Sequence, residues 1–205
     1  MIITAPDEIE ARSMEIIERE LPFPLPEENK AVVKRVIHCT ADFDYATNLT
    51  FSDGAAAKAL AALRRGCRIV TDTTMAKAGI NKAAAAKLGC EICCFMSDPD
   101  VAEATRTRGC TRAVASMEKA AALEGETVFV IGNAPTALLR LKELIDEGKI
   151  HPALVIGVPV GFVNIIESKT AIVETDVPFI VAKGRKGGSN VAAAIVNALM
   201  YQITR

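Results

Sequence analysis

The chain has 205 residues, of which 50% are hydrophobic, and its 24 basic and 25 acidic side chains leave a net charge of -1. This length fits one domain or a small pair, and the apolar content excludes an intrinsically disordered chain. The lack of a basic excess disfavours nucleic-acid binding, and no apolar run reaches the roughly 18 residues of a membrane span. The N-terminus lacks the pattern of a signal peptide, so we expect a cytoplasmic protein whose cysteines are free thiols.

Two helices are expected before the regular part of the chain. Pro6 and Asp7 begin the first, which has an apolar face, and Pro26 begins the second, which has another. The proline-rich run 21–26 between them cannot be helical and forms a linker. We expect residues 1–45 to form a helical arm that caps the sheet or reaches a partner subunit, and residues 46–205 to form the core of a single domain.

From Gly66 onward, short apolar runs alternate with Ala-rich helical runs. The expected strands are residues 68–71, 91–95, 127–131, 153–156 and 178–182, and the expected helices include 83–88, 111–123, 134–147 and 189–202. Such apolar runs are typical of strands covered on both faces, and the alternation indicates right-handed crossovers. The sequence therefore predicts a three-layer α/β/α fold with a doubly wound, mainly parallel sheet of about five strands, flavodoxin-like or Rossmann-like in style.

Turns rich in glycine, proline and hydroxyl side chains follow nearly every expected strand. Ligands of open parallel sheets bind beyond the carboxyl ends of the strands. Turn geometry and helix capping require the same residue types without any ligand, but several such turns at one edge favour a binding site. Asp72, directly after its strand, either orients a ligand or caps the residues from Thr73 onward. The turns cover residues 71–75, 97–99, 132–136, 157–162 and 183–189.

The turn at 183–189 is the most informative, because it combines glycines, three cations and a hydroxyl just before a helix. Exposed backbone amides and the helix dipole suit an anion, either phosphate or carboxylate. The sequence has neither a P-loop nor a Gly-x-Gly-x-x-Gly pattern after a strand, so a nucleotide cofactor is not supported.

The two histidines differ in context. His151 precedes Pro152 in a connection and is expected to be a solvated loop residue. His38 ends the second helix, with Arg35 one turn earlier on the same face; a proton donor beside a cation suits an anionic substrate that must be protonated. Spacing alone leaves a structural or surface role for His38 open. The Cys-x-x-Cys at 90–93 has no second ligand pair for zinc and falls in an expected strand, so we interpret it as core.

Several motifs, in their order along the chain, resemble precorrin-8X methylmutases and their cobalt-pathway counterparts. They are residues 35–38, 132–138, 159–163, 167–169 and 184–189, with Asp72, Met75, Thr111 and Arg112. The resemblance runs from about Ile9 to the final helix. It implies a homodimeric, cofactor-independent isomerase of corrin construction with flavodoxin-like subunits. Such an enzyme moves a methyl group from the α carbon to the adjacent β carbon of ring C in precorrin-8X or cobalt-precorrin-8, giving hydrogenobyrinic or cobyrinic acid.

The resemblance also implies roles for particular residues. His38 would protonate or hydrogen-bond a ring nitrogen, making the conjugated system electron-poor enough for the methyl shift. The basic side chains would hold the carboxylates that fringe the ring, and the apolar turn at 159–162 would face its flat surface. Any cobalt would arrive inside the ring, so no protein metal site is expected. The expected substrate-binding residues are Ser13, Arg35, Asp72, Arg112, Asn133, Thr136, Gly161, Lys183, Arg185, Lys186, Gly188 and Ser189.

Two other function classes stay open. A phospho-sugar isomerase could use the glycine-rich turn for phosphate, but it would need a second acid or base near His38, and none is evident. A non-catalytic tetrapyrrole carrier would bind the same ligand, so binding alone would not separate it from an enzyme, whereas turnover would.

Overall fold

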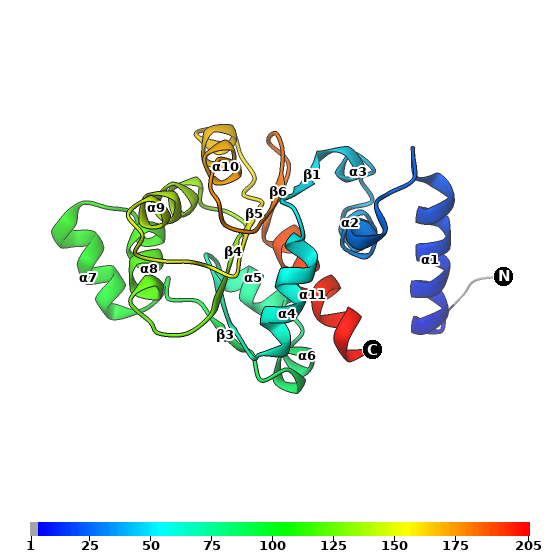
Figure 1. The fold of residues 1–205 in the computed structure, drawn as a ribbon, viewed down its shortest axis with the longest axis horizontal. Helices are drawn as coiled ribbons and strands as arrows, with labels where there is room; N and C mark the ends of the chain where they lie inside the picture. Colours follow the sequence, from blue (N-terminus) through cyan, green and yellow to red (C-terminus); the bar gives the residue numbers. More distant parts are fainter. Residues whose placement is uncertain (1–3) are drawn as a thin grey trace.

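A six-stranded sheet forms the centre of the computed structural model, which describes residues 4–205 (Figure 1). The strands are β1 (Leu49–Phe51), β2 (Arg68–Thr71), β3 (Glu91–Cys93), β4 (Thr127–Ile131), β5 (Leu154–Gly157) and β6 (Phe179–Ala182). They lie in the order β1-β6-β5-β4-β2-β3, with β1 antiparallel to β6 and the other pairs parallel. The five parallel strands follow the flavodoxin-like order 2-1-3-4-5, so the direction of winding reverses between β2 and β4.

Eleven helices surround this sheet within residues 4–205. They are α1 (Pro6–Glu20), α2 (Glu27–Thr40), α3 (Tyr45–Asn48), α4 (Ala55–Arg64), α5 (Thr74–Gly79), α6 (Lys82–Lys87), α7 (Pro99–Arg108), α8 (Arg112–Ala121), α9 (Pro135–Asp146), α10 (Ile165–Val173) and α11 (Ser189–Thr204). None of them is both long and apolar enough to cross a bilayer.

Two hydrophobic cores lie on opposite faces of the sheet. Val128 and Val130 of β4 join the core under α2, α4, α6 and α11, whereas Phe129 and Ile131 join the core under α8, α9 and α10. Successive strand residues point to opposite faces, so a strand that is apolar at every position must be covered on both sides. The predicted three-layer α/β/α architecture is confirmed.

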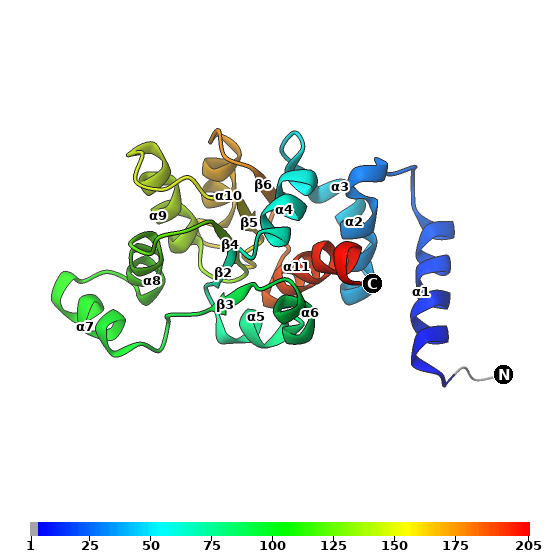
Figure 2. The same cartoon turned by 60° about the horizontal axis from the view of Figure 1, so that its bottom comes forward.

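The two N-terminal helices pack to different degrees. Helix α2 packs along α11 and buries Val32, Val33, Val36 and Ile37 in the first core. Among residues 6–20 of α1, only Ile17 is buried. Figures 1 and 2 both place α1 at one end of the molecule, beyond α2.

The sequence prediction missed one strand. β1 is three residues long, too short for a periodic signal, and it exists because it pairs with β6 from Leu49 opposite Ala182 to Phe51 opposite Ile180. The other five expected strands are present, with β2 and β4 at the predicted bounds and β3 two residues shorter. The sheet therefore has six strands rather than five.

Candidate functional site

Asp72 lies at the carboxyl end of β2 and is fully buried. Its carboxylate accepts hydrogen bonds from three consecutive backbone N–H groups, those of Gly132 (2.9 Å), Asn133 (2.9 Å) and Ala134 (2.7 Å). Burial raises the pKa of this carboxyl, and the backbone hydrogen bonds act against that rise. Both oxygens are engaged with the β4–α9 loop, so the geometry gives Asp72 a role in holding that loop.

Of the two roles that the sequence leaves open for Asp72, the structure excludes the capping of the residues from Thr73 onward. The hydroxyl of Thr73 itself caps α5 by accepting a hydrogen bond from the N–H of Ala76. Asp72 instead reaches across the reversal point of the sheet to the loop after β4. The sequence shows an acidic residue at a strand end but does not show which neighbouring loop it will meet.

The loops after β2, β4 and β6 meet at this edge. The hydroxyl oxygens of Thr73 and Ser189 lie 2.8 Å apart. A Cβ on Gly132 would lie 2.8 Å from the Cα of Ser189, so only glycine allows the start of α11 to approach so closely. The structure thus brings Asp72, Asn133 and Ser189 of the predicted site into one small region.

The loop between β6 and α11 is held from its buried side by Lys169 of α10. The Lys169 residue is 2% exposed, and its Nζ donates hydrogen bonds to the carbonyl oxygens of Gly184 (2.8 Å) and Lys186 (2.9 Å). Burial lowers the pKa of Lys169 to about 8. Gly188 is buried, and its N–H donates to the carbonyl oxygen of Val158.

Lys169 belongs to the motif at residues 167–169, but the sequence pattern indicates no role for it. A single lysine in a short helix is normally solvated, and nothing local indicates that this one is buried. The available signal was its position within the largely apolar helix α10, next to another buried polar residue, Ser168.

The three cations of the glycine-rich loop have different surroundings. Lys183 and Arg185 are exposed, and the Arg185 guanidinium lies 5.5 Å from the ring centre of Phe162. The Lys186 ammonium instead pairs with Asp42 and Asp44, each at 2.6 Å, which raises the pKa of Lys186. Lys186 therefore ties the loop to the segment after α2.

The remaining predicted residues of this edge lie at helix starts and in the β5–α10 loop. Arg112 is exposed in the first turn of α8 and makes no ion pair with residues 4–205. The hydroxyl of Thr136 lies 3.1 Å from that of Thr111, which caps α8, and Asn133 is exposed. The N–H of Gly161 donates to the carbonyl of Arg185 at 3.3 Å, which joins the β5–α10 loop to the glycine-rich loop.

His38 and Ser13 line one cavity of about 380 Å³ between α1 and α2. His38 is exposed, whereas Ser13 is half-buried and donates a hydrogen bond to the carbonyl of Ile9 at 2.7 Å. Apolar side chains of Ile16, Ile17 and Ile37 also line this cavity. An imidazole beside a hydroxyl in a mostly apolar cavity can donate or accept a proton.

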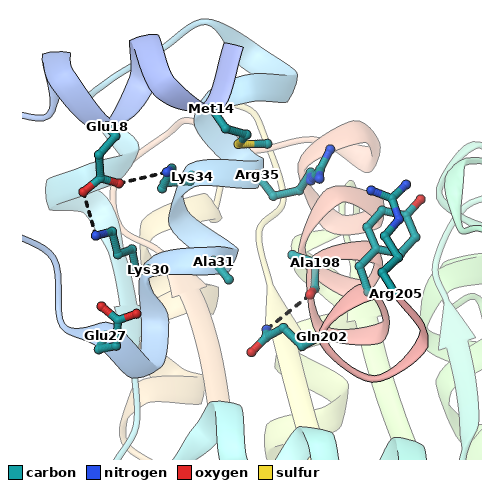
Figure 3. Close-up of a pocket in the computed structure, with 11 residues that line it drawn as sticks. Met14, Glu18, Glu27, Lys30, Ala31, Lys34, Arg35, Ala198, Gln202 and Arg205 are labelled. Carbon is teal, nitrogen blue, oxygen red and sulfur yellow. Dashed lines mark hydrogen bonds and ion pairs between the residues drawn. The ribbon is translucent and has the colours of Figure 1, made fainter. Parts of the chain in front are cut away.

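Arg35 lines a different cavity of about 520 Å³, between α1, α2 and α11 (Figure 3). Its guanidinium pairs with Glu10 of α1 at 2.5 Å and lies 5.4 Å from the ring centre of Tyr201. Within one chain, Arg35 and His38 therefore line different cavities, although they lie one turn apart on α2. Arg205 pairs with the same carboxylate at 2.8 Å.

The glycine-rich loop contacts the end of α2, the helix that carries Arg35 and His38. Lys186 reaches Asp42 and Asp44 there, and the thiol of Cys39 lies 3.7 Å from the carbonyl of Asn190, which it donates to. The glycine-rich loop and the start of α11 thus lie beside the segment that carries His38.

All six cysteines are free thiols. Within residues 4–205, no group of three or more His, Cys, Asp or Glu side chains could hold a metal ion.

Comparison with known proteins is consistent across sequence and structure. The family model for precorrin-8X methylmutase matches residues 8–202. The cobalt-precorrin-8 methylmutase of Salmonella typhimurium is 48% identical over 98% of this chain and 97% of that protein. The precorrin-8X methylmutase of Pseudomonas aeruginosa is 39% identical over 85% of each chain. The solved structure of the Thermus thermophilus precorrin-8X methylmutase superposes with a TM-score of 0.87 at 40% identity, covering 95% of both chains. The family predicted from the motif order is confirmed: this chain belongs to the precorrin-8X methylmutase family of isomerases.

Proposed function

We propose that this protein moves a methyl group from the α carbon to the adjacent β carbon of ring C in cobalt-precorrin-8, giving cobyrinic acid. The observation that carries this proposal is the 48% identity, over nearly the full length of both chains, to a protein named cobalt-precorrin-8 methylmutase. Two further relatives with that name are 44% and 45% identical, whereas three proteins named precorrin-8X methylmutase are 40%, 39% and 35% identical. The cobalt belongs to the substrate in this reaction.

His38 supplies the proton in the proposed mechanism. Its imidazole is exposed at a cavity whose other polar side chains are those of Ser13 and Glu20 and whose remaining walls are apolar, so a ring nitrogen placed there can meet the imidazole as a donor. Protonation or hydrogen bonding of that nitrogen withdraws electron density from the conjugated ring and eases migration of the methyl group. A positioned general acid typically contributes about 10²–10⁴-fold in rate.

The carboxylates of the ring are held by the cations at the carboxyl edge of the sheet. Lys183, Arg185 and Arg112 are exposed there and pair with no acidic side chain of the described residues, so their charges are available to a ligand. Charge-assisted hydrogen bonds to carboxylates are about twice as strong as neutral ones. Lys186 differs, because two aspartates already engage its ammonium. Its proposed contribution is to hold the loop in place.

We also propose that the protein acts as a homodimer, in which the N-terminal helices of one subunit complete the site of the other. The β5–α10 loop exposes 83% of Phe162, 74% of Val163 and 48% of Val160. Such a group of exposed apolar side chains is typical of a binding surface, here for the flat ring of the substrate or for a second copy of the chain. Helix α1, with Ile17 as the single buried residue among residues 6–20, has an apolar face left to cover. We also propose that the protein is cytoplasmic, a compartment in which its six cysteines would stay reduced.

The proposal is tested by turnover. Purified protein is incubated with cobalt-precorrin-8 and, separately, with precorrin-8X, and the absorption spectrum is followed. We expect conversion of the cobalt substrate, and a loss of about 10²–10⁴-fold in rate for His38→Ala with the ligand still bound. His151→Ala is the matched control, since this exposed histidine lies before β5 at the opposite edge of the sheet.

Other outcomes separate the alternatives. Tight binding of the ring without any turnover would identify a carrier. If a simple phosphorylated sugar competed with the corrin for binding, a phospho-sugar isomerase would become the better assignment. Wild-type rates in His38→Ala would overturn the assigned acid, and sedimentation as a monomer at micromolar concentration would overturn the dimer.

A further inference from the structure

The glycine-rich loop holds two of its peptide groups in a fixed orientation. The Nζ of Lys169 donates to the carbonyl oxygens of Gly184 and Lys186, so both carbonyls point toward the buried ammonium. A trans peptide is planar, with its N–H on the side opposite its carbonyl. The N–H groups of Arg185 and Gly187 therefore point away from Lys169.

These two N–H groups have no acceptor of their own among residues 4–205. The N–H groups at the two ends of the loop do have acceptors: that of Lys183 donates to the carbonyl of Asn48 at 2.8 Å, and that of Gly188 donates to the carbonyl of Val158 at 2.8 Å. The same loop thus carries backbone N–H groups without an internal partner and the exposed side chain of Arg185. Such an arrangement is typical of a site for an anion.

The ammonium of Lys169 is also unusual in its electrostatic setting. It is buried beneath the loop and pairs with no carboxylate in the described part of the chain; two carbonyl oxygens are its partners. Burial lowers its pKa to about 8, so the amine still carries its charge at neutral pH. An unpaired buried charge is costly to a fold, and a negative ligand on the other side of the loop would offset part of that cost.

We propose that Lys169 is a positioning residue: it aims the N–H groups of Arg185 and Gly187 at a carboxylate of the substrate and places a positive charge behind them. The inference deepens the proposed function and rests on it for the identity of the ligand, a carboxylate at the edge of the corrin ring. Fixed donors of this kind bind an anion without reorganising the loop.

The kinetic signature follows from the place of the contact. A carboxylate at the edge of the ring is held equally in the ground state and in the transition state, so its loss raises KM and leaves kcat unchanged. A residue that served only the stability of the fold would lower the amount of active enzyme, and hence the apparent kcat, without changing KM.

The test compares Lys169→Met with Ser168→Ala. Ser168 is fully buried on the same helix, and its hydroxyl donates to the carbonyl of Ile165 at 3.0 Å without contacting the loop. We expect Lys169→Met to raise KM by about 10–100-fold, the range for losing hydrogen bonds that involve a charge. Ser168→Ala should keep the wild-type KM even if it lowers stability. A wild-type KM in folded Lys169→Met would overturn the inference.

A second measurement does not depend on turnover. Acetate is titrated into the labelled protein, and the amide signals of Arg185 and Gly187 are followed by NMR. We expect both signals to shift and saturate in the wild type, and to stay unshifted in Lys169→Met. If the wild type turns over no corrin but shows these shifts, the proposed function fails while the role of Lys169 stands. If the amide signals of Arg185 and Gly187 in the wild type did not shift with acetate, the inference would be overturned directly.

Lys169→Gln covers the case in which the methionine variant does not fold. It keeps two N–H donors for the loop carbonyls but removes the charge. We expect its KM to rise by less than that of Lys169→Met and its acetate shifts to weaken. An unchanged KM and unchanged acetate shifts in folded Lys169→Gln would show that the buried charge contributes nothing to the loop.

Discussion

The carboxyl edge of the sheet and the N-terminal helix α1 are held by different kinds of interaction. At the edge, the buried side chains of Asp72 and Lys169 bond to the backbone of two loops, and Gly132 and Gly187 leave no room for a side chain. Helix α1 buries only Ile17 among residues 6–20, and ion pairs at the surface connect it to the rest of the protein.

The contrast indicates which part of the site is formed before the substrate arrives. Buried hydrogen bonds to a charged group resist water and salt, whereas surface ion pairs are screened by both. The loops that would hold carboxylates are therefore set in advance. Ser13 belongs to α1 and His38 to the well-packed α2, so one wall of the cavity between them is anchored in the core and the other is held mainly by surface ion pairs.

The largest effect is expected from Gly187→Ala, which adds a side chain at the tightly packed carboxyl edge of the sheet. A Cβ at this position would lie 2.1 Å from the carbonyl oxygen of Val158, so the backbone must move. We expect a loss of about 3–5 kcal/mol in the free energy of unfolding, measured in urea. The control is Gly184→Ala, in the same loop with φ +73° and no atom within 4 Å of the added Cβ. It should cost about 1 kcal/mol, the price of the left-handed conformation alone. Equal losses in the two variants would show that the loop is not tightly packed.

The charge of Lys169 gives the edge a dependence on pH. Its pKa is about 8 in the folded protein against an ordinary value of 10.5, so between these values the unfolded chain binds the proton more readily. The contribution of this group to stability is therefore fully present above pH 10.5 and is lost as pH falls through 8. Relative to Lys169→Met, the wild type should gain on the order of 3 kcal/mol across this window, at 1.36 kcal/mol per pKa unit. Parallel pH curves for the two proteins would mean that Lys169 is not buried as a cation.

Asp72→Asn should disturb the same edge more mildly. The substitution keeps the shape of the side chain but leaves one acceptor oxygen for three N–H groups. We expect a cost of about 2 kcal/mol, because buried donors lose a charged partner. Urea unfolding measures it, with the exposed Asp53→Asn as the control that should stay near the wild type.

The smallest effect is expected from Glu10→Gln, which tests how α1 is held. It removes the pairs of Glu10 with Arg35 and Arg205, both partly open to solvent. Such pairs contribute about 0–1 kcal/mol, and less at high salt. Exposed Glu8→Gln on the same helix is the control. A loss of several kcal/mol that persists in 1 M salt would show that α1 is held as firmly as the edge of the sheet.

Much of the fold could be read from neighbours along the chain. Residues 68–71 and 127–131 are strands at the bounds predicted, since short, almost wholly apolar runs identify buried strands. The helix starts at Pro6, Pro135 and Ser189 are each within one residue of the prediction. The family could also be predicted, because the resemblance depends on the order of short motifs along the sequence. The match of the family model over residues 8–202 confirmed it.

The tertiary structure decided what depends on distant segments. β1 forms only because β6 offers an open edge, and Asp72 holds a loop sixty residues later in the chain, with Gly132 as its first partner. Lys169 is buried because α10 places it under the glycine-rich loop. Arg35 lines a different cavity from His38, and its guanidinium contacts Glu10 and Tyr201, which come from other helices. Local periodicity and turn chemistry are written in adjacent residues, whereas burial and hydrogen-bond partners arise only when separate elements pack together.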